Sequence, residues 1–230
     1  MSNASIPANI TKVLQQVSSA VEKYHRTAES VHVMAVSKTQ PAEAVRAAAN
    51  AGLQDFGENY LQEALDKIAA CADLELTWHF IGPIQSNKTR PIASSFDWVH
   101  SVDREKVLRR LSEQRDPGLA PLNICLQVNV SGESSKSGVT PEQLPALLAL
   151  ASELPNIRLR GLMAIPAPAQ DFAAQKQACD TLAGLFKKAQ QSYPSLDTLS
   201  MGMSGDLEAA VAAGSNMLRI GTAIFGARQG

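Results

Sequence analysis

Short apolar runs alternate with longer amphipathic stretches along most of the chain. The first apolar run, "VHVMAVS" at 31–37, is short and rich in valine, as in a parallel strand buried on both faces. Before it, the apolar residues of "NITKVLQQVSSAVEKYH" recur at helical spacing and predict a leading amphipathic helix. After it, "PAEAVRAAANAG" predicts a helix that begins at Pro41 and ends near Gly52.

The same alternation repeats to the end of the chain. Further strands are predicted at "LQDFG", "LTWHFIG", "DWVHSV", "LNICLQVNV", "IRLRGLMAI", "DTLSMG" and "NMLRIG", with helix-like stretches such as "NYLQEALDKIAA", "DREKVLRRLSEQ" and "PEQLPALLALASEL" between them. Eight strands alternating with helices predict a closed parallel (β/α)8 barrel, formed by residues 1–230 as one domain. An open doubly wound sheet is the alternative. The loop "SKTQP" weakens it, because no glycine follows the first strand to admit a pyrophosphate.

Composition excludes several classes of protein. A hydrophobic fraction of 45% and a charged fraction of 19% are ordinary for a globular chain, and a net charge of −1 argues against nucleic-acid binding. No apolar run is long enough to span a membrane, and "MSNASIPANI" lacks the features of a signal peptide, so we expect a cytoplasmic protein. The odd, widely spaced Cys71, Cys125 and Cys179 predict reduced core residues and disfavour both disulfides and a metal site.

The chemistry of such a barrel lies where the strands end. The residues that follow each strand converge on one mouth, and Lys38 is the first of them. A lysine in this place can simply reach solvent. Arg219 interrupts the apolar run "MLRIG", where an unpaired guanidinium is costly, so it needs an acceptor. That acceptor is either a carboxylate, such as Glu58 or Asp206, or a ligand.

The loops after the seventh and eighth strands have the features of a phosphate site. Ser204 offers a hydroxyl, while Gly221 and Thr222 offer backbone N–H groups and a second hydroxyl near a helix start. The structural alternatives are a helix N-cap for Ser204 and a tight turn for Gly221. A lysine amine, an anion site and an arginine together match a phosphorylated aldehyde bound as a Schiff base. Pyridoxal 5'-phosphate (PLP) is the leading candidate, and a class I aldolase acting on a sugar phosphate fits the bare geometry equally well.

The motifs, taken together, resemble one family. "AVSKTQP", "GENYLQEA", "WHFIGPIQSNK", "VNVSGESSKSG", "GLMAI" and "LSMGMSGDLEAAVAAGSNMLRIGTAIFGAR" are similar, in order, to the motifs of the YggS/PROSC family of PLP homeostasis proteins. The resemblance extends from Val31 to Arg228. It implies the barrel of the alanine racemase amino-terminal domain and a covalent PLP aldimine on Lys38.

The resemblance also assigns the other site residues. It implies phosphate contacts for Ser204, Gly221 and Thr222, an arginine facing the pyridine nitrogen at Arg219, and pocket-lining roles for Asn59 and Met201. Gly205 departs from the family, because many relatives have an acidic residue there. Lys136, in the loop at 131–138, receives no chemistry.

The implied function is a cytoplasmic carrier or buffer of PLP with no turnover of its own, delivering the cofactor to PLP-requiring apoenzymes. A racemase-like enzyme is the alternative, but it needs an acid/base on the ring face opposite the lysine. In two-domain racemases a tyrosine of a carboxyl-terminal β domain has that role, and this chain stops at Gly230. Tyr60 alone among the tyrosines closely follows a strand, and its helical setting favours packing. Without the main contact of the racemase dimer, we expect a monomer that binds neither nucleic acid nor membranes.

Overall fold

Eight parallel strands close a barrel in the order β1-β2-β3-β4-β5-β6-β7-β8 in the computed structural model, which describes residues 5–133 and 136–226. The strands are β1 (His32–Val36), β2 (Asp55–Glu58), β3 (Thr77–Phe80), β4 (Trp98–Val102), β5 (Leu122–Gln127), β6 (Ile157–Met163), β7 (Thr198–Ser200) and β8 (Met217–Ile220). Seven of them lie inside the runs predicted as strands, and β2 extends one residue beyond its run, to Glu58. The predicted barrel is confirmed, and the open sheet is wrong because β1 pairs with β8 and leaves no edge.

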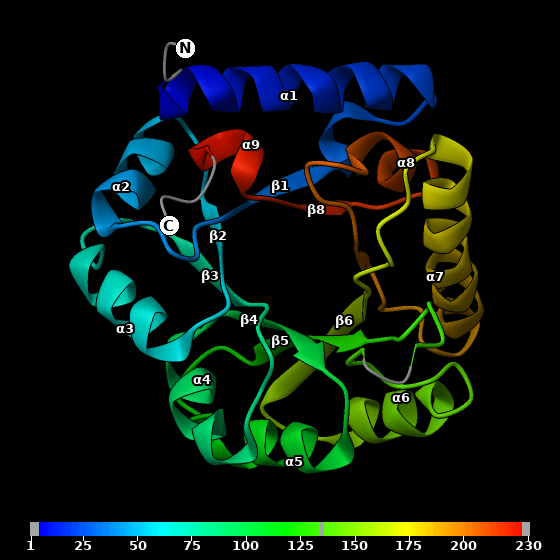
Figure 1. Ribbon diagram of the computed structural model, residues 1–230. Helices are drawn as coiled ribbons and strands as arrows, with labels where there is room; N and C mark the ends of the chain where they lie inside the picture. The colour runs from blue at the N-terminus through cyan, green and yellow to red at the C-terminus, as the bar shows by residue number, and fades with distance from the viewer. Residues whose placement is uncertain (1–4, 134–135, 227–230) are drawn as a thin grey trace.

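Helices surround the barrel on the outside (Figure 1). They are α1 (Ile6–Lys23), α2 (Ala42–Asn50), α3 (Leu61–Ala70), α4 (Thr89–Ser95), α5 (Glu105–Gln114), α6 (Leu144–Glu153), α7 (Phe172–Ser192), α8 (Leu207–Ala212) and α9 (Thr222–Phe225), with 3-10 turns η1 (Ala28–Ser30) and η2 (Ser86–Lys88). The prediction of a single domain over 1–230 includes residues 1–4 and 227–230, which lie outside the described ranges. None of the described helices combines the length and the apolar character needed to cross a membrane.

Strand register separates the barrel interior from the outer core. Met34 is paired with Arg219, and Val36 with Gly57, so these positions share the inner face. Inside, Met34, Ile81 and Met217 form a small apolar cluster, whereas the large core lies between strands and helices and includes buried Cys71 and Cys179. A Cβ at Gly57 would lie only 2.6 Å from Sδ of Met34, so glycine makes room for this interior cluster.

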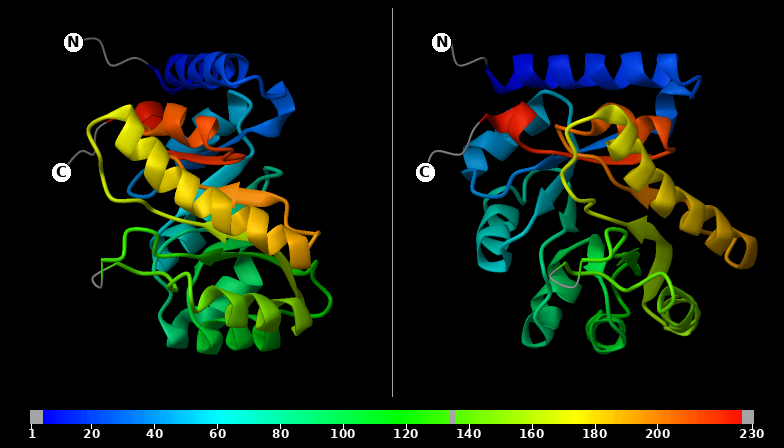
Figure 2. Two further views of the ribbon diagram at one scale, coloured as in Figure 1. Left: turned by 90° about the vertical axis from the view of Figure 1, so that its right-hand side faces the viewer. Right: turned by 45° about the vertical axis from the view of Figure 1, so that its right-hand side comes forward.

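Helix α1 lies outside the ring of barrel helices, beside the elements that follow β7 and β8 (Figures 1 and 2). Its buried stripe includes Ile10, Val13 and Val17, and it packs on α8 and α9. Nδ2 of Asn9 donates to the carbonyl of Ile224 at 2.9 Å, and Arg26 donates to carbonyls at the end of α8 and beyond. The leading helix therefore braces the two short helices next to the expected phosphate site.

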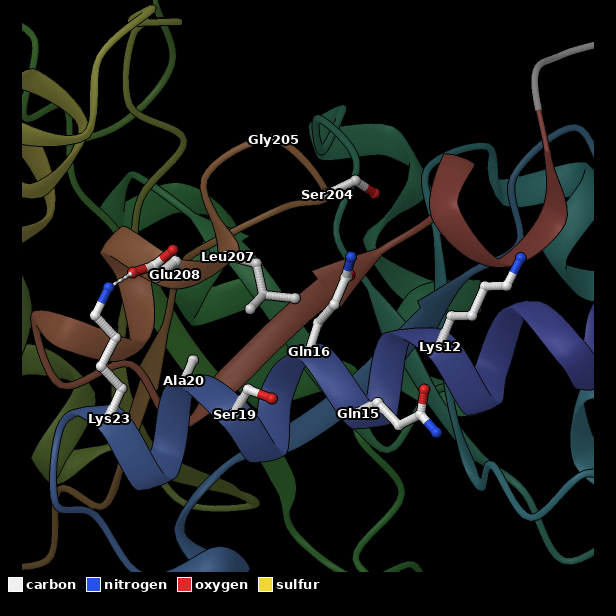
Figure 3. A pocket seen from close by; sticks show the side chains of 10 residues that line it. All are labelled: Lys12, Gln15, Gln16, Ser19, Ala20, Lys23, Ser204, Gly205, Leu207 and Glu208. Atoms are coloured by element: carbon white, nitrogen blue, oxygen red, sulfur yellow. Dashed lines mark hydrogen bonds and ion pairs between the residues drawn. The ribbon is translucent and has the colours of Figure 1, made fainter.

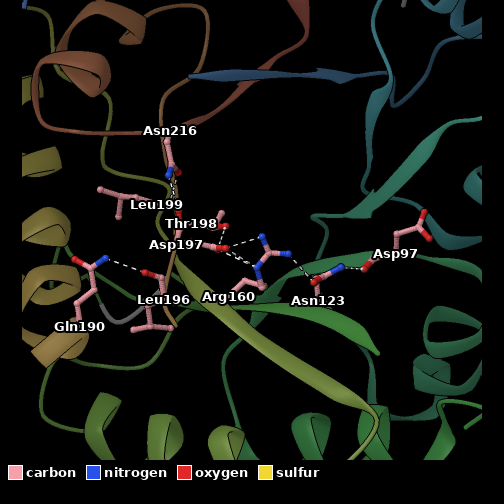
Figure 4. A network of polar contacts seen from close by, with 9 residues as sticks. All are labelled: Asp97, Asn123, Arg160, Gln190, Leu196, Asp197, Thr198, Leu199 and Asn216. Atoms are coloured by element: carbon pink, nitrogen blue, oxygen red, sulfur yellow. Dashed lines mark hydrogen bonds and ion pairs between the residues drawn. The ribbon is translucent and has the colours of Figure 1, made fainter. Parts of the chain in front are cut away.

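A polar network joins the amino-terminal ends of several strands (Figure 4). Arg160 makes three hydrogen bonds of 2.7–3.0 Å to the Asp197 carboxylate and one of 2.8 Å to Oδ1 of Asn123. Its guanidinium also lies 4.5 Å from the ring centroid of Trp98. The opposite, carboxyl-terminal end is where the predicted site residues lie.

Candidate functional site

Lys38 lies in a turn directly after β1 and is half-buried. The turn closes through a hydrogen bond of 3.0 Å from Gln40 N to the carbonyl of Ser37. Thr39 has a φ of 63°, in the left-handed region that a β-branched residue rarely adopts. The backbone that carries Lys38 is therefore held in a conformation that the surrounding contacts must maintain.

Those contacts come from a buried ionic network between β1, β2 and α3. Nζ of Lys67 donates to the carbonyl of Ser37 at 2.6 Å, to Oε1 of Glu58 at 2.8 Å and to Oε1 of Glu63 at 2.5 Å. The Ser37 hydroxyl donates to Glu58 Oε1 at 2.6 Å, and Thr39 N donates to Glu63 Oε1 at 2.5 Å. Burial raises the pKa of the Glu58 carboxyl, against the opposing effect of Lys67. None of this network was predicted from the sequence, since a lysine at helical spacing in α3 resembles any surface lysine.

The loop after β7 presents Ser204 to solvent. Gly202 turns the chain with a φ of +98°, and a Cβ there would lie 2.5 Å from Cβ of Ala210. Asp206, and not Ser204, is the N-cap residue of α8, and its carboxylate accepts a hydrogen bond of 2.6 Å from Met203 N. The Ser204 hydroxyl instead accepts one of 3.4 Å from Ala223 N, at the start of α9. This contact links the β7 loop to the β8 loop.

The loop after β8 lies against the end of β1. A Cβ at Gly221 would lie 3.2 Å from the carbonyl oxygen of Val36, two residues before Lys38. The Gly221 carbonyl accepts from the N–H groups of Ile224 and Phe225 as α9 begins, and Thr222 is exposed at its first position. The structure thus brings Lys38, Ser204, Gly221 and Thr222 to neighbouring strand ends.

Arg219 lies in the barrel interior and is only 4% exposed. Its Nη1 donates to the Ser200 hydroxyl and its Nη2 to the carbonyl of Ala164, each at 2.8 Å. Neither Glu58 nor Asp206, the carboxylates considered from the sequence, accepts a hydrogen bond from it. Burial lowers the pKa of the guanidinium to about 10, so it stays charged at neutral pH. Two of its five N–H groups are used in these bonds, which fits an arginine that also contacts a ligand.

Asn59 and Met201 differ as pocket residues. Oδ1 of Asn59 is buried and has no hydrogen-bond partner among the described residues. A buried orphan acceptor at a strand end fits a hydrogen bond donated by a ligand. Met201 is fully buried in the large outer core, and its carbonyl accepts from the Ser215 hydroxyl at 2.6 Å. The side chain of Met201 therefore supports the β7 loop from the core between the strands and the helices, and only its backbone can approach a ligand.

A groove of about 590 Å³ runs along the outer side of the β7 loop (Figure 3). Its walls are α1 and the start of α8, and Ser204 lies on its rim. The side chains of Lys12 and Gln16 project from α1 toward this space, whereas Lys23 is paired with Glu208 at 2.6 Å. Lys12 and Gln16 therefore line this outer groove from α1, and Ser204 lines it from the β7 loop.

Tyr60 and Lys136, which the sequence also singled out, both lie in loops. Tyr60 was expected to pack, and this is wrong: it precedes α3 at the rim of a cavity of about 340 Å³ and is 53% exposed. Lys136 lies in the loop 131–138, of which 134–135 are outside the described residues. Its Nζ pairs with Glu133 at 3.1 Å, so it is an ion-paired loop lysine.

The comparisons with known proteins agree with this geometry. The family described as "Alanine racemase, N-terminal domain" matches residues 13–229. A "Pyridoxal phosphate homeostasis protein" of Pseudomonas aeruginosa is 61% identical over 225 residues, which cover 98% of this chain and 96% of the relative. The structure of PipY from Synechococcus elongatus PCC7942 with PLP bound has a TM-score of 0.81 at 37% identity, covering 93% of this chain and all of that one.

Alanine racemase from Corynebacterium glutamicum shares the fold alone, with a TM-score of 0.74 at 15% identity, covering 98% of this chain and 61% of the racemase chain. The fold and the matched residues define a barrel of the alanine racemase amino-terminal-domain class. Within that class, the chain belongs to the YggS/PROSC family, whose curated members are the pyridoxal phosphate homeostasis proteins.

Proposed function

We propose that this chain binds PLP and acts in PLP homeostasis inside the cell, as a cytoplasmic carrier or buffer without turnover of its own. The ε-amine of Lys38 forms a C=N bond with the PLP aldehyde carbon, and the carbonyl oxygen leaves as water. Ser204, Gly221 and Thr222 hold the phosphate, Arg219 faces the pyridine nitrogen, and Asn59 lines the pocket. PLP-requiring apoenzymes then receive the cofactor in transient encounters.

One observation carries the proposal: a lysine, two loops with the sequence features of a phosphate site and a buried arginine lie at the ends of β1, β7 and β8. Gly221 lies against Val36, and the hydroxyl of Ser204 reaches the backbone of α9. The names of relatives that are 61% and 50% identical over nearly the full chain support the same ligand, as does the PLP-bound PipY.

Arg219 also favours binding over turnover. A guanidinium gives up its proton too reluctantly to protonate the pyridine nitrogen, even with its pKa lowered to about 10. An unprotonated ring is a weak electron sink, which disfavours carbanion chemistry. The racemase alternative also needs a second acid/base on the ring face opposite Lys38, a role that the proposal assigns to no residue of this chain; the hydroxyl of Tyr24 already donates to Glu208.

The test is borohydride reduction of the purified protein after PLP is added, followed by peptide mass mapping. A phosphopyridoxyl group on Lys38 is expected, which Lys38→Ala abolishes and Lys106→Ala, on the exposed face of α5, does not. Labelling that is spread equally over surface lysines would refute the site. An assay of amino-acid racemisation on the unreduced protein separates the two functions, because measurable turnover that depends on Lys38 would establish the enzyme.

A further inference from the structure

A continuous chain of buried side chains crosses the barrel interior below Arg219. Ser200 Oγ, which accepts from Arg219, lies 2.9 Å from Nδ1 of His100. Nε2 of His100 lies 2.9 Å from Nδ1 of His79, and Nε2 of His79 lies 2.9 Å from Oδ1 of Asp55. Asp55 begins β2 at the amino-terminal end of the barrel, where its side chain is 29% exposed. The chain thus links that end to the arginine near the mouth.

The chemistry at its two ends sets the direction of the hydrogen bonds. An ionised Asp55 carboxylate can only accept, so Nε2–H of His79 donates to it and Nδ1 of a neutral His79 must accept. Nε2–H of His100 then donates to His79, and the Ser200 hydroxyl donates to Nδ1 of His100. At the other end, a guanidinium can only donate, so Ser200 accepts from Arg219. In this arrangement each contact of the chain has one donor and one acceptor, so each hydrogen has a single position.

The surroundings favour a neutral imidazole at His100. His79 and His100 are fully buried, and His79 stacks on Trp98 with ring centroids 5.5 Å apart. Burial, followed by the neighbouring His79 ring and then by the charge of Arg219, lowers the pKa of His100 well below its ordinary value. Among the described residues no group of three His, Cys, Asp or Glu side chains is arranged to hold a metal ion, so the pair is not a metal site.

We propose that Ser200, His100 and His79 are positioning residues for PLP: through this one-way hydrogen-bond chain they fix the plane of the Arg219 guanidinium that faces the pyridine nitrogen. The inference rests on the proposed function and deepens it. A planar guanidinium held at both Nη1 and Nη2 cannot turn about its Nε–Cδ bond without breaking these hydrogen bonds. The remaining N–H groups then keep one orientation toward the ligand before it arrives.

The first test compares Ser200→Ala with Ser112→Ala, a matched buried serine of α5 whose hydroxyl bonds the Pro155 carbonyl far from the site. Ser200→Ala is expected to raise the dissociation constant of PLP about tenfold and to shift the visible absorption maximum of the bound form, because Arg219 loses one anchor. Ser112→Ala is expected to change neither. Equal PLP affinity and equal spectra in the two variants would overturn the inference.

A second test needs no PLP. Nitrogen NMR of the histidine-labelled protein at neutral pH should show both His79 and His100 as neutral rings with the proton on Nε2. A doubly protonated His79, or a proton on Nδ1 of His100, would reverse the direction of the chain and overturn the inference. The variant His100→Asn offers Ser200 an acceptor near the position of Nδ1, so it should bind PLP more tightly than His100→Leu. An equal loss of PLP affinity in the two variants would contradict the inference.

The outcomes separate this inference from the proposed function. Wild-type protein that forms no adduct on Lys38 overturns the proposed function, whatever the histidine signals show. Wild-type protein that binds PLP on Lys38, while Ser200→Ala behaves as Ser112→Ala, overturns the positioning role alone.

Discussion

Lys67 and Glu58 are the residues on which the Lys38 turn depends most directly. Replacing Lys67 by Met keeps the length of the side chain and leaves the Glu58 carboxyl buried without its cation. Removing one partner of a buried pair costs about 3–5 kcal/mol, so we expect Lys67→Met to lower the free energy of unfolding by about 3 kcal/mol in urea titrations. The double variant with Glu58→Gln should recover part of that loss. A single variant as stable as wild type would contradict the role of the pair.

The Glu58 carboxyl also predicts a dependence on pH. Burial raises its pKa in the folded protein above the ordinary 4.5. A raised carboxyl pKa means that the contribution of Glu58 to stability is fully present below about pH 4.5 and is lost as pH rises through the folded value. Glu58→Gln mimics the protonated group at every pH, so its stability relative to wild type should increase with pH above 4.5. Unfolding free energies measured from pH 4 to 8 check this; a constant difference would count against it.

Single residues were predictable where they break a pattern. Lys38 and Arg219 interrupt apolar strand runs, so the sequence alone marked both. Glu58 and Lys67 carry no such mark, and although His79 and His100 lie inside strand runs, nothing local indicates their partners, because these come from other elements and only the closed barrel brings them together. The distance between His100 and Ser200, which are 100 residues apart in sequence, follows from barrel closure and from nothing local.

At the scale of elements, the two glycines of the β7 loop make a matched pair. Gly202 has a φ of +98° and no room for a Cβ, whereas Gly205 has no positive φ, and a Cβ there would meet no atom within 4 Å. We expect Gly202→Ala to destabilise the protein by about 2 kcal/mol and to weaken PLP binding, because the loop that carries Ser204 must move. Gly205→Ala should be neutral in both thermal unfolding and PLP titration. Equal effects of the two substitutions would show that the loop geometry is unimportant.

The elements themselves were well predicted, and their junctions were not. The length of each apolar run marked every strand, since burial on both faces gives a parallel strand a distinct apolar run. The helical spacing of apolar residues marked the leading helix. The N-cap of α8 is Asp206 and not Ser204, and Tyr60 is exposed and not packed. The expected packing of Tyr60 is wrong, and Ser204 does not take the N-cap role that was its structural alternative. Both positions fall where a strand passes into a helix, because loop conformation there depends on neighbouring loops that the local sequence does not contain.

For the whole molecule, the distribution of exposed apolar side chains predicts a monomer. The large exposed apolar residues among those described are Leu14, Tyr60, Leu119, Ile165, Phe172 and Met203, and they belong to α1, α7 and several separate loops. A stable dimer buries about 1,200–2,000 Å² in one continuous contact. Sedimentation equilibrium should therefore give the mass of one chain with and without PLP, and a stable dimer in either state would contradict the prediction.

The site joins the first and last strands of the barrel, so ligand binding should stabilise the entire fold. Lys38 follows β1 and the loops proposed to hold the phosphate follow β7 and β8, while β1 pairs with β8 to close the barrel. A ligand that binds only the folded state at one hundred times its dissociation constant adds about 2.7 kcal/mol, which corresponds to an increase of about 5–10 °C in the unfolding midpoint for a chain of this size. Thermal unfolding followed by far-ultraviolet circular dichroism, with and without PLP, measures the increase. Lys38→Ala should lose most of it, because the covalent bond is gone, while Lys106→Ala should keep it. An equal increase in both variants would mean that PLP stabilises the barrel from somewhere other than the end of β1.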